Sequence, residues 1–362
     1  EHGAVNDNLT SWPATAMSFD VFDAAHGAQM AARLAGSTIM TDWGARPLSG
    51  ASKLFDPLHY NNGAVWPFVT GWVSLAQYRY HNAHAGRFAL DAIARTGFDE
   101  SRGRNPEVIS GRVYKPLDTA VPHQFFASSM VLTPLMRGML GLDVDAPAGR
   151  IRLSPSLPPE WDSVRVEHVR VGKDVVGLLL TRKERTLGVE LWREGGGGDA
   201  GRPLEIDFAP SLPLGADSIA VSSGEAGTVE QLSGAVVAHA RARLRERVRL
   251  FVTWSGGWEV QVPQAAPRIG DRSAALRVLS ERLDGGKYTL QLEGRAGATY
   301  AIGVRGPAGT QMSVTVRPIT ATMPPLVLGA LDQRGFAPLN VTFPTADANS
   351  DGYVPLSLVF AR

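Results

Sequence analysis

The hydrophobic residues of this chain change their spacing near residue 149. Before that point, apolar residues recur every three or four positions, as on one face of a helix, and loops rich in Gly, Pro and Asn separate the segments. After it, short segments alternate apolar and polar residues, as half-buried strands do. The change predicts an α+β protein of several domains, with boundaries at 1–148, 149–265 and 266–362.

Five helices are expected in the first domain, over 12–22, 23–35, 66–80, 84–97 and 122–140. Pro13 suits a first helical position, and Asp23 can cap the second helix. The third and fifth segments are apolar nearly all round and are expected to be inner helices, whereas the fourth has a polar stripe at 87, 91 and 95 and is expected outside. Alternating inner and outer helices predict part of a helical toroid.

The β region is expected to form an antiparallel β-sandwich. Alternation is clearest over 187–192, 248–254, 288–293 and 300–304. The Ser-Gly-Gly sequence at 255–257 is expected to turn the chain back into a new strand that begins at Trp258. The last two domains are then segments of one sandwich or of two adjacent ones.

The charge and composition of the 362-residue chain narrow its function. A net charge of +1 gives no long-range attraction to nucleic acid or to an acidic membrane, and favours a neutral partner such as carbohydrate. The absence of cysteine excludes disulfides and thiolate chemistry. No stretch of about 20 apolar residues predicts a membrane span. The first residues lack signal-peptide features, and the sequence does not assign a compartment, whether cytoplasm, periplasm or exterior.

Four loop clusters, at 41–46, 60–67, 106–110 and 122–126, combine aromatic, carboxylate and amide side chains. Loops at helix ends can direct such groups into one pocket. A sugar site needs flat apolar faces, hydrogen-bonding groups and a carboxylate. The candidate catalytic residue is Glu107, and the candidate substrate-binding residues are Asp42, Trp43, Arg46, Tyr60, Trp66, His123, Gln124 and Phe126.

Each candidate also has a structural interpretation. Glu107 has Arg104 and Arg112 close in sequence as alternative partners. Asp42 is expected to hydrogen-bond sugar hydroxyls or to orient Arg46 rather than to protonate a leaving group. Tryptophans at the starts of inner helices are often core residues, and His123 can contact substrate or cap its helix.

The ordered series of motifs resembles a known family, the glucoamylase-like (α/α)6 barrel, or six-hairpin, glycoside hydrolases. It is most similar to the amylo-α-1,6-glucosidase part of glycogen-debranching enzymes and their bacterial relatives. The matching stretches are Gly-Ala-Val-Trp-Pro at 63–67, Pro-Glu-Val-Ile at 106–109, Gln-Phe-Phe-Ala at 124–127 and Leu-Pro-Pro-Glu-Trp at 157–161. The resemblance covers roughly residues 9–165 of this chain, which correspond to the C-terminal half of the family's barrel. Phe126 and Ala127 replace a tryptophan and a serine of the family.

The resemblance implies a partial (α/α)6 toroid that belongs to an inverting hydrolase of terminal α-glucosidic bonds, α-1,6 or similar. Glu107 is then the general base, and a second carboxylic acid about 6.5–9.5 Å away must protonate the leaving group. In the family that acid lies upstream of the matched region, so the N-terminal half of the barrel, from the same gene or a second chain, is an expected partner. No cofactor is implied.

Two alternatives to a hydrolase stay open. A non-catalytic carbohydrate-binding or assembly protein can keep the aromatic pocket without the acid. A glycoside phosphorylase on the same scaffold needs a phosphate site, and no lysine-and-glycine group near Glu107 favours one.

Three further patterns are assigned to structure rather than function. Arginines alternate over 241–249, which predicts one solvated strand face paired with acids rather than an anion-binding stripe. Residues 347–352 imitate half of a calcium loop, but Leu358 replaces the required glutamate, so a polar turn is expected. His81 and His84 lack a carboxylate at metal spacing, and no metal site is predicted.

Overall fold

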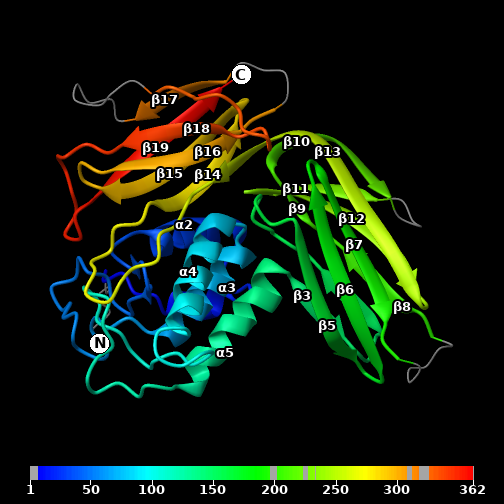
Figure 1. The fold of residues 1–362 in the computed structure, drawn as a ribbon, viewed down its shortest axis with the longest axis horizontal. Helices are drawn as coiled ribbons and strands as arrows, with labels where there is room; N and C mark the ends of the chain where they lie inside the picture. The colour runs from blue at the N-terminus through cyan, green and yellow to red at the C-terminus, as the bar shows by residue number, and fades with distance from the viewer. Residues whose placement is uncertain are drawn as a thin grey trace.

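The structure is a computed structural model that describes residues 7–195, 202–222, 227–232, 234–307, 312–317 and 326–361. All of its described helices precede residue 140, and the long strands follow (Figure 1). The helices are α1 (Pro13–Met17), α2 (Ala24–Ala35), α3 (Pro67–Arg79), α4 (Ala83–Thr96), α5 (Phe125–Thr133) and the π-helical turn η1 (Pro134–Met139). A short hairpin, β1 (Met40–Thr41) and β2 (Gly44–Ala45), separates α2 from α3.

The strands of the first β part are β3 (Leu142–Asp145), β4 (Arg150–Leu153), β5 (Ser163–Val171), β6 (Asp174–Lys183), β7 (Thr186–Arg193), β8 (Leu204–Phe208), β9 (Ser211–Leu212), β10 (Leu214–Ser222), β11 (Thr228–Leu232), β12 (Ala235–Leu244) and β13 (Arg247–Gln261). The later strands are β14 (Arg277–Asp284), β15 (Lys287–Arg295), β16 (Thr299–Arg305), β17 (Ser313–Arg317), β18 (Ala337–Thr342) and β19 (Tyr353–Ala361). The alternating segments of the sequence are confirmed as strands of mainly antiparallel sheets.

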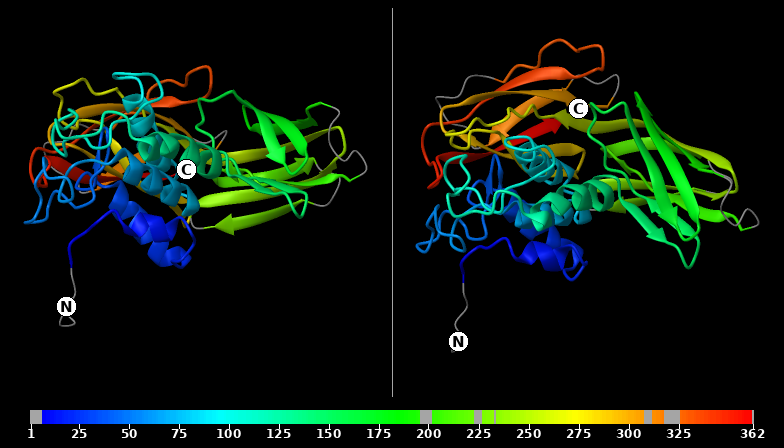
Figure 2. Two further views of the ribbon diagram at one scale, coloured as in Figure 1. Left: turned by 90° about the horizontal axis from the view of Figure 1, so that it is seen from below. Right: turned by 60° about the horizontal axis from the view of Figure 1, so that its bottom comes forward.

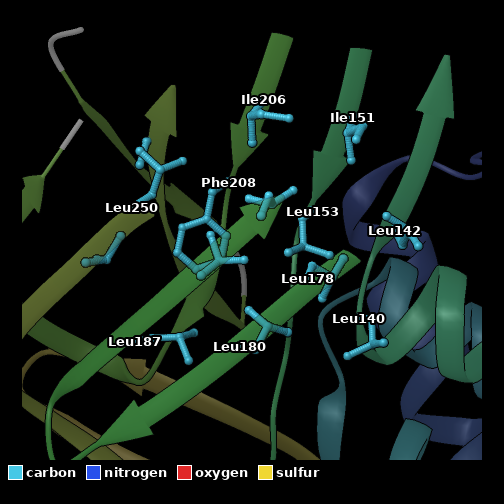
Figure 3. Close-up of a cluster of buried hydrophobic side chains, with 14 of the residues drawn as sticks. Leu140, Leu142, Ile151, Leu153, Leu178, Leu180, Leu187, Ile206, Phe208 and Leu250 are labelled. Carbon is cyan, nitrogen blue, oxygen red and sulfur yellow. The ribbon is translucent and has the colours of Figure 1, made fainter. Parts of the chain in front are cut away.

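The first sandwich packs a sheet of order β18-β16-β13-β7-β6-β5 against one of order β11-β12-β8-β4-β3. Aliphatic side chains from both sheets meet in a dry core, where Leu153 and Phe208 face Leu178, Leu180 and Leu250 (Figure 3). Alternation places these residues on the inner faces because successive strand side chains point to opposite sides. Almost all pairings are antiparallel; β4 with β8 is parallel.

The second sandwich shares one long strand with the first. The first half of β13 pairs with β7 and its last residues pair with β16. Leu250 on β13 therefore enters one core and Trp258 enters the other, which faces the sheet of order β14-β15-β19-β17. Gly256 and Gly257 have φ of 65° and 84°, and they bend β13 without reversing it. The predicted turn at 255–257 is therefore wrong.

The helices occupy the angle between the two β parts (Figures 1 and 2). α3 lies at their centre and contacts α1, α4 and α5, while α2 and α4 also pack against β14 of the second sandwich. α5 continues into η1 at Pro134, where the missing N–H interrupts the α-helical bonding pattern. Within the described ranges, no helix has the length and apolar character needed to cross a bilayer.

The predicted partial (α/α)6 toroid, and with it the six-hairpin description, is wrong. Strands make up 41% of the structure and helices only 18%, and the five α-helices are short. Residues 97–124, between α4 and α5, form loops rather than a further helix pair. The apolar spacing indicated that the helical segments have buried faces. It did not show that β14 covers part of the apolar surface of α2 and α4.

The arginine pattern is divided between two strands. Arg241 and Arg243 lie on β12, whereas Arg247 and Arg249 lie on β13 beyond a turn. All four are exposed, and the last two pair with Glu190, so a solvated and partly paired surface results.

Candidate functional site

Backbone hydrogen bonds bring the loops around Glu107 together. The Val65 and Ile109 backbones pair in both directions at 2.7 and 2.9 Å, which joins the segment before α3 to the loop after α4. The Glu107 amide donates to the Val121 carbonyl at 2.9 Å. The segment before α3 and two stretches of the α4–α5 connection therefore meet at the N-terminal ends of α3 and α5.

The Glu107 carboxylate is half-buried and held at both oxygens. The Tyr60 hydroxyl donates to Oε1, and the Val121 amide donates to Oε2 at 3.2 Å. Burial, followed by the hydrogen bond and charge of Glu107, raises the pKa of Tyr60 to about 12. The phenol therefore keeps its proton near neutral pH and acts as a donor to the carboxylate.

Two pairs of aromatic rings lie at these loop and helix ends, and Tyr60 of one pair contacts the carboxylate. Tyr60 meets Trp66 edge-on, with ring centroids 4.4 Å apart, and the indole Nε1 donates to the Tyr60 carbonyl at 2.9 Å. Phe68, in the first turn of α3, contacts Phe126 of α5 at 5.8 Å. Phe126 is 61% exposed and Tyr60 39%, so these rings present apolar area to solvent beside a carboxylate.

The residues at the start of α5 have different surroundings. Gln124 is the N-cap of α5, and its backbone N–H donates to the Asn105 carbonyl at 3.0 Å. Its side-chain Oε1 is buried without a hydrogen-bond partner among the described residues. His123 is exposed.

Asp42 and Arg46 lie in buried ion pairs, not on the aromatic surface. The Asp42 carboxylate accepts from Arg277 Nη2 at 3.0 Å and from the backbone amides of Ala274 and Ala275 at 2.7 and 3.0 Å. Arg46 makes a bidentate pair with Asp351 at 2.8 and 2.9 Å rather than contacting Asp42. Both pairs join the helical part to the later β strands.

Trp43 is a core residue, only 1% exposed. It packs with Val65, Ile109 and Tyr114, and its indole Nε1 donates to the Ser110 carbonyl at 2.9 Å. The structure therefore gathers Glu107, Tyr60, Trp66, Gln124 and Phe126 at the loop ends. It places Trp43, like Asp42 and Arg46, in buried contacts.

Two members of the surface were not among the sequence candidates. Phe68 fits a helical core pattern, and Phe125 fits the apolar surface of an expected inner helix. Phe125 is 82% exposed in the structure. The available signal was their position: Phe68 directly follows the matched stretch 63–67, and Phe125 lies within the matched stretch 124–127.

No protein-family model matches the chain, and a search of curated proteins finds no match to it. Across the described part of the chain, no group of three or more His, Cys, Asp or Glu side chains is arranged to hold a metal ion. The chemistry is therefore inferred from the carboxylate and the rings around it.

Proposed function

We propose that this protein binds a glycan on the aromatic surface around Glu107 and hydrolyses a glycosidic bond with Glu107 as the general base. One observation carries the proposal: a carboxylate fixed at both oxygens lies among partly exposed aromatic rings. Such rings stack on the apolar faces of pyranoses, and such a carboxylate can accept a proton from water. The ordered motifs at 63–67, 106–109 and 124–127 support α-glucosides as the substrate class.

In the proposed reaction, Glu107 removes a proton from a water molecule whose oxygen attacks the anomeric carbon. The bond to the leaving oxygen breaks on the opposite face, and a carboxylic acid about 6.5–9.5 Å from the base protonates that oxygen. The configuration at the anomeric carbon is therefore inverted. Tyr60 and the Val121 amide orient the carboxylate, because each binds a different oxygen.

The second acid belongs upstream of the matched region in the family that the motifs resemble. A further protein segment, in the same polypeptide or a second one, is the proposed supplier of this acid.

A non-catalytic carbohydrate-binding protein is the second candidate. It is favoured by the openness of the surface, where Phe125 and Phe126 are 82% and 61% exposed, because a hydrolytic site normally excludes bulk water. Both candidates predict glycan binding, and only the first predicts turnover that depends on Glu107.

The test compares Glu107→Gln with Glu100→Gln, an exposed carboxylate of the same interhelical loop. Binding of α-glucan oligosaccharides is measured by calorimetry, and hydrolysis with its anomeric product is followed by NMR. Glu107→Gln is expected to retain binding and lower turnover by about a hundredfold to ten-thousandfold, the usual contribution of a general base. Glu100→Gln is expected to resemble the unmodified protein in both assays.

Both assays use the protein together with the segment that supplies the acid, and binding without turnover in that complete protein would favour the second candidate. Absence of both binding and turnover across the oligosaccharides, or equal turnover in the two variants, would contradict the proposed role of Glu107.

A further inference from the structure

A groove of about 880 Å³ lies between the two β parts, away from Glu107. Its walls come from the β6–β7 hairpin, the end of β16 and residues 331–336. Five cationic side chains line the groove: Arg182, Lys183, Arg185, Arg305 and Arg334. Two carboxylates, Asp162 and Glu184, also line it. The volume is typical of small-molecule sites, and the charge of the lining is distinctly positive.

Three of these cations form ion pairs with two carboxylates. Glu259, whose side chain is 8% exposed, accepts hydrogen bonds from both Arg182 and Arg305. Arg334 pairs with Asp162 at 3.0 Å. These ion pairs join the two sandwiches, so Arg182, Arg305 and Arg334 stabilise the fold.

Arg185 and Lys183 remain without a carboxylate. Arg185 donates from Nη1 to the Gly256 carbonyl at 2.6 Å and from Nη2 to the Gly306 carbonyl at 3.1 Å. In the described part of the chain, neither Arg185 nor Lys183 forms an ion pair. Burial lowers the pKa of Arg185 and the nearby charge of Arg305 lowers it further, while the charges of Glu259 and Asp217 only partly oppose the shift. An anion in the groove would offset both effects.

The hairpin holds Arg185 in place before any ligand binds. β6 ends at Lys183 and β7 begins at Thr186, so Glu184 and Arg185 form a two-residue turn. Glu184 has φ of 51°, a conformation that is unfavourable for a residue with a side chain and that is often maintained at functional positions. The two carbonyl contacts fix the guanidinium, and a planar guanidinium can bind an oxyanion with paired hydrogen bonds.

Apolar side chains complete the groove. Phe336, Met312 and Leu331 line it, and the Arg305 guanidinium lies 4.6 Å from the centre of the Phe336 ring. We propose that this groove binds a small organic oxyanion, in which a phosphate, sulfate or carboxylate group meets Arg185 and Lys183 and an apolar body meets Leu331, which is 65% exposed.

The proposal is tested by calorimetric titration of the full chain with inorganic phosphate, sulfate and glucuronate at low and high salt. These probes distinguish the three oxyanions. The variants are Arg185→Gln and Lys183→Gln, with Arg245→Gln as the control. Arg245 is an exposed cation in the turn before β13, and the register of β7 with β13 places that turn at the opposite end of the sheet from Thr186.

At least one probe is expected to bind saturably at low salt and more weakly at high salt. Arg185→Gln and Lys183→Gln are each expected to weaken binding roughly fivefold or more, the loss of a charge-assisted contact, while Arg245→Gln has little effect. Lys183 makes no structural ion pair, so its variant decides the test if Arg185→Gln fails to fold. No saturable binding, or equal binding by Lys183→Gln and the control, would overturn the proposal.

Discussion

At the scale of single residues, the same type of side chain has different roles according to its surroundings. Glu107 and Asp42 are both carboxylates in loops of the helical part. Glu107 is half-buried beside exposed rings, whereas Asp42 is 7% exposed and is bound to a guanidinium that is itself 1% exposed. The first arrangement leaves an oxygen near solvent for chemistry, and the second uses its hydrogen-bonding capacity for stability.

Asp42→Asn is expected to lower the free energy of unfolding by about 3 kcal/mol or more, because it leaves the buried charge of Arg277 without its partner. Arg277 is also enclosed by the rings of Phe88 and Tyr353, at 5.3 and 4.3 Å from the ring centroids, so water cannot replace the lost carboxylate. Urea denaturation followed by circular dichroism measures the change.

The control for this substitution is Asp118→Asn, whose carboxylate is 94% exposed and 3.9 Å from Lys115. It is expected to change stability by less than about 1 kcal/mol. If Asp42→Asn instead left stability unchanged and weakened glycan binding, the structural role assigned to Asp42 would be incorrect.

At the scale of elements, the ends of α3 show how local geometry positions side chains. Its start carries Trp66 and Phe68 to the aromatic surface. At its other end, His81 has a φ of 57°, and the chain leaves the helix there. The backbone N–H of Asn82 donates back to the Gln77 carbonyl at 2.9 Å. Glycine or asparagine usually occupies this left-handed position, so His81 is strained there.

His81→Asn is expected to make the protein less sensitive to acid. Burial lowers the pKa of His81 below its usual value of 6.5, and the charge of Glu230 only partly opposes this. The unfolded chain then binds a proton more readily than the folded one, so this contribution to stability is present above pH 6.5 and decreases as the pH falls below it.

The measurement is the melting temperature of both proteins between pH 5 and pH 8. At high pH the two melting temperatures are expected to differ only by the strain that asparagine relieves, and the difference is expected to grow in acid, where His81→Asn melts at the higher temperature. An NMR titration of His81 with a midpoint at or above the ordinary histidine value would contradict this explanation.

At the scale of the whole molecule, a row of aromatic rings crosses the uncovered side of the helices. Phe19 contacts Trp72 at 5.9 Å, Trp72 contacts Phe68 at 6.3 Å, and Phe68 contacts Phe126. Leu132, on the adjoining α5, is 62% exposed, and α5 has no charged residue. Contiguous exposed apolar surface of this kind promotes association.

The protein is therefore expected to self-associate as its concentration rises, and the double variant Phe19→Ser, Leu132→Ser is expected to weaken this association at least tenfold. Each substitution removes an apolar side chain whose full burial stabilises by about 1.5–3 kcal/mol. Sedimentation velocity measures the change. The matched control, Ile269→Ser with Val327→Ser, removes exposed side chains from elsewhere and should associate like the unmodified protein. A monomer at all concentrations would contradict the expectation.

The sequence by itself determined where the helical and the β regions lie and which loops carry the aromatic and carboxylate groups. The alternation at 187–192 and the apolar spacing at 66–80 predict β7 and α3 because side-chain direction follows backbone geometry within one segment. The pattern also selected Glu107, Tyr60 and Trp66, which contact one another through Tyr60, and Phe126, which contacts Phe68.

Only the tertiary structure decided what covers each face and which loop residues are buried. Periodicity shows that α2 and α4 each have a buried side. The spacing does not show which distant segment covers that side, and in the structure it is β14 rather than further helices. For the same reason Asp42 and Arg46 resembled site residues, although their partners Arg277 and Asp351 lie more than 200 positions later in the chain. Distant contacts of this kind determine whether a polar loop residue serves stability or stays open to a ligand.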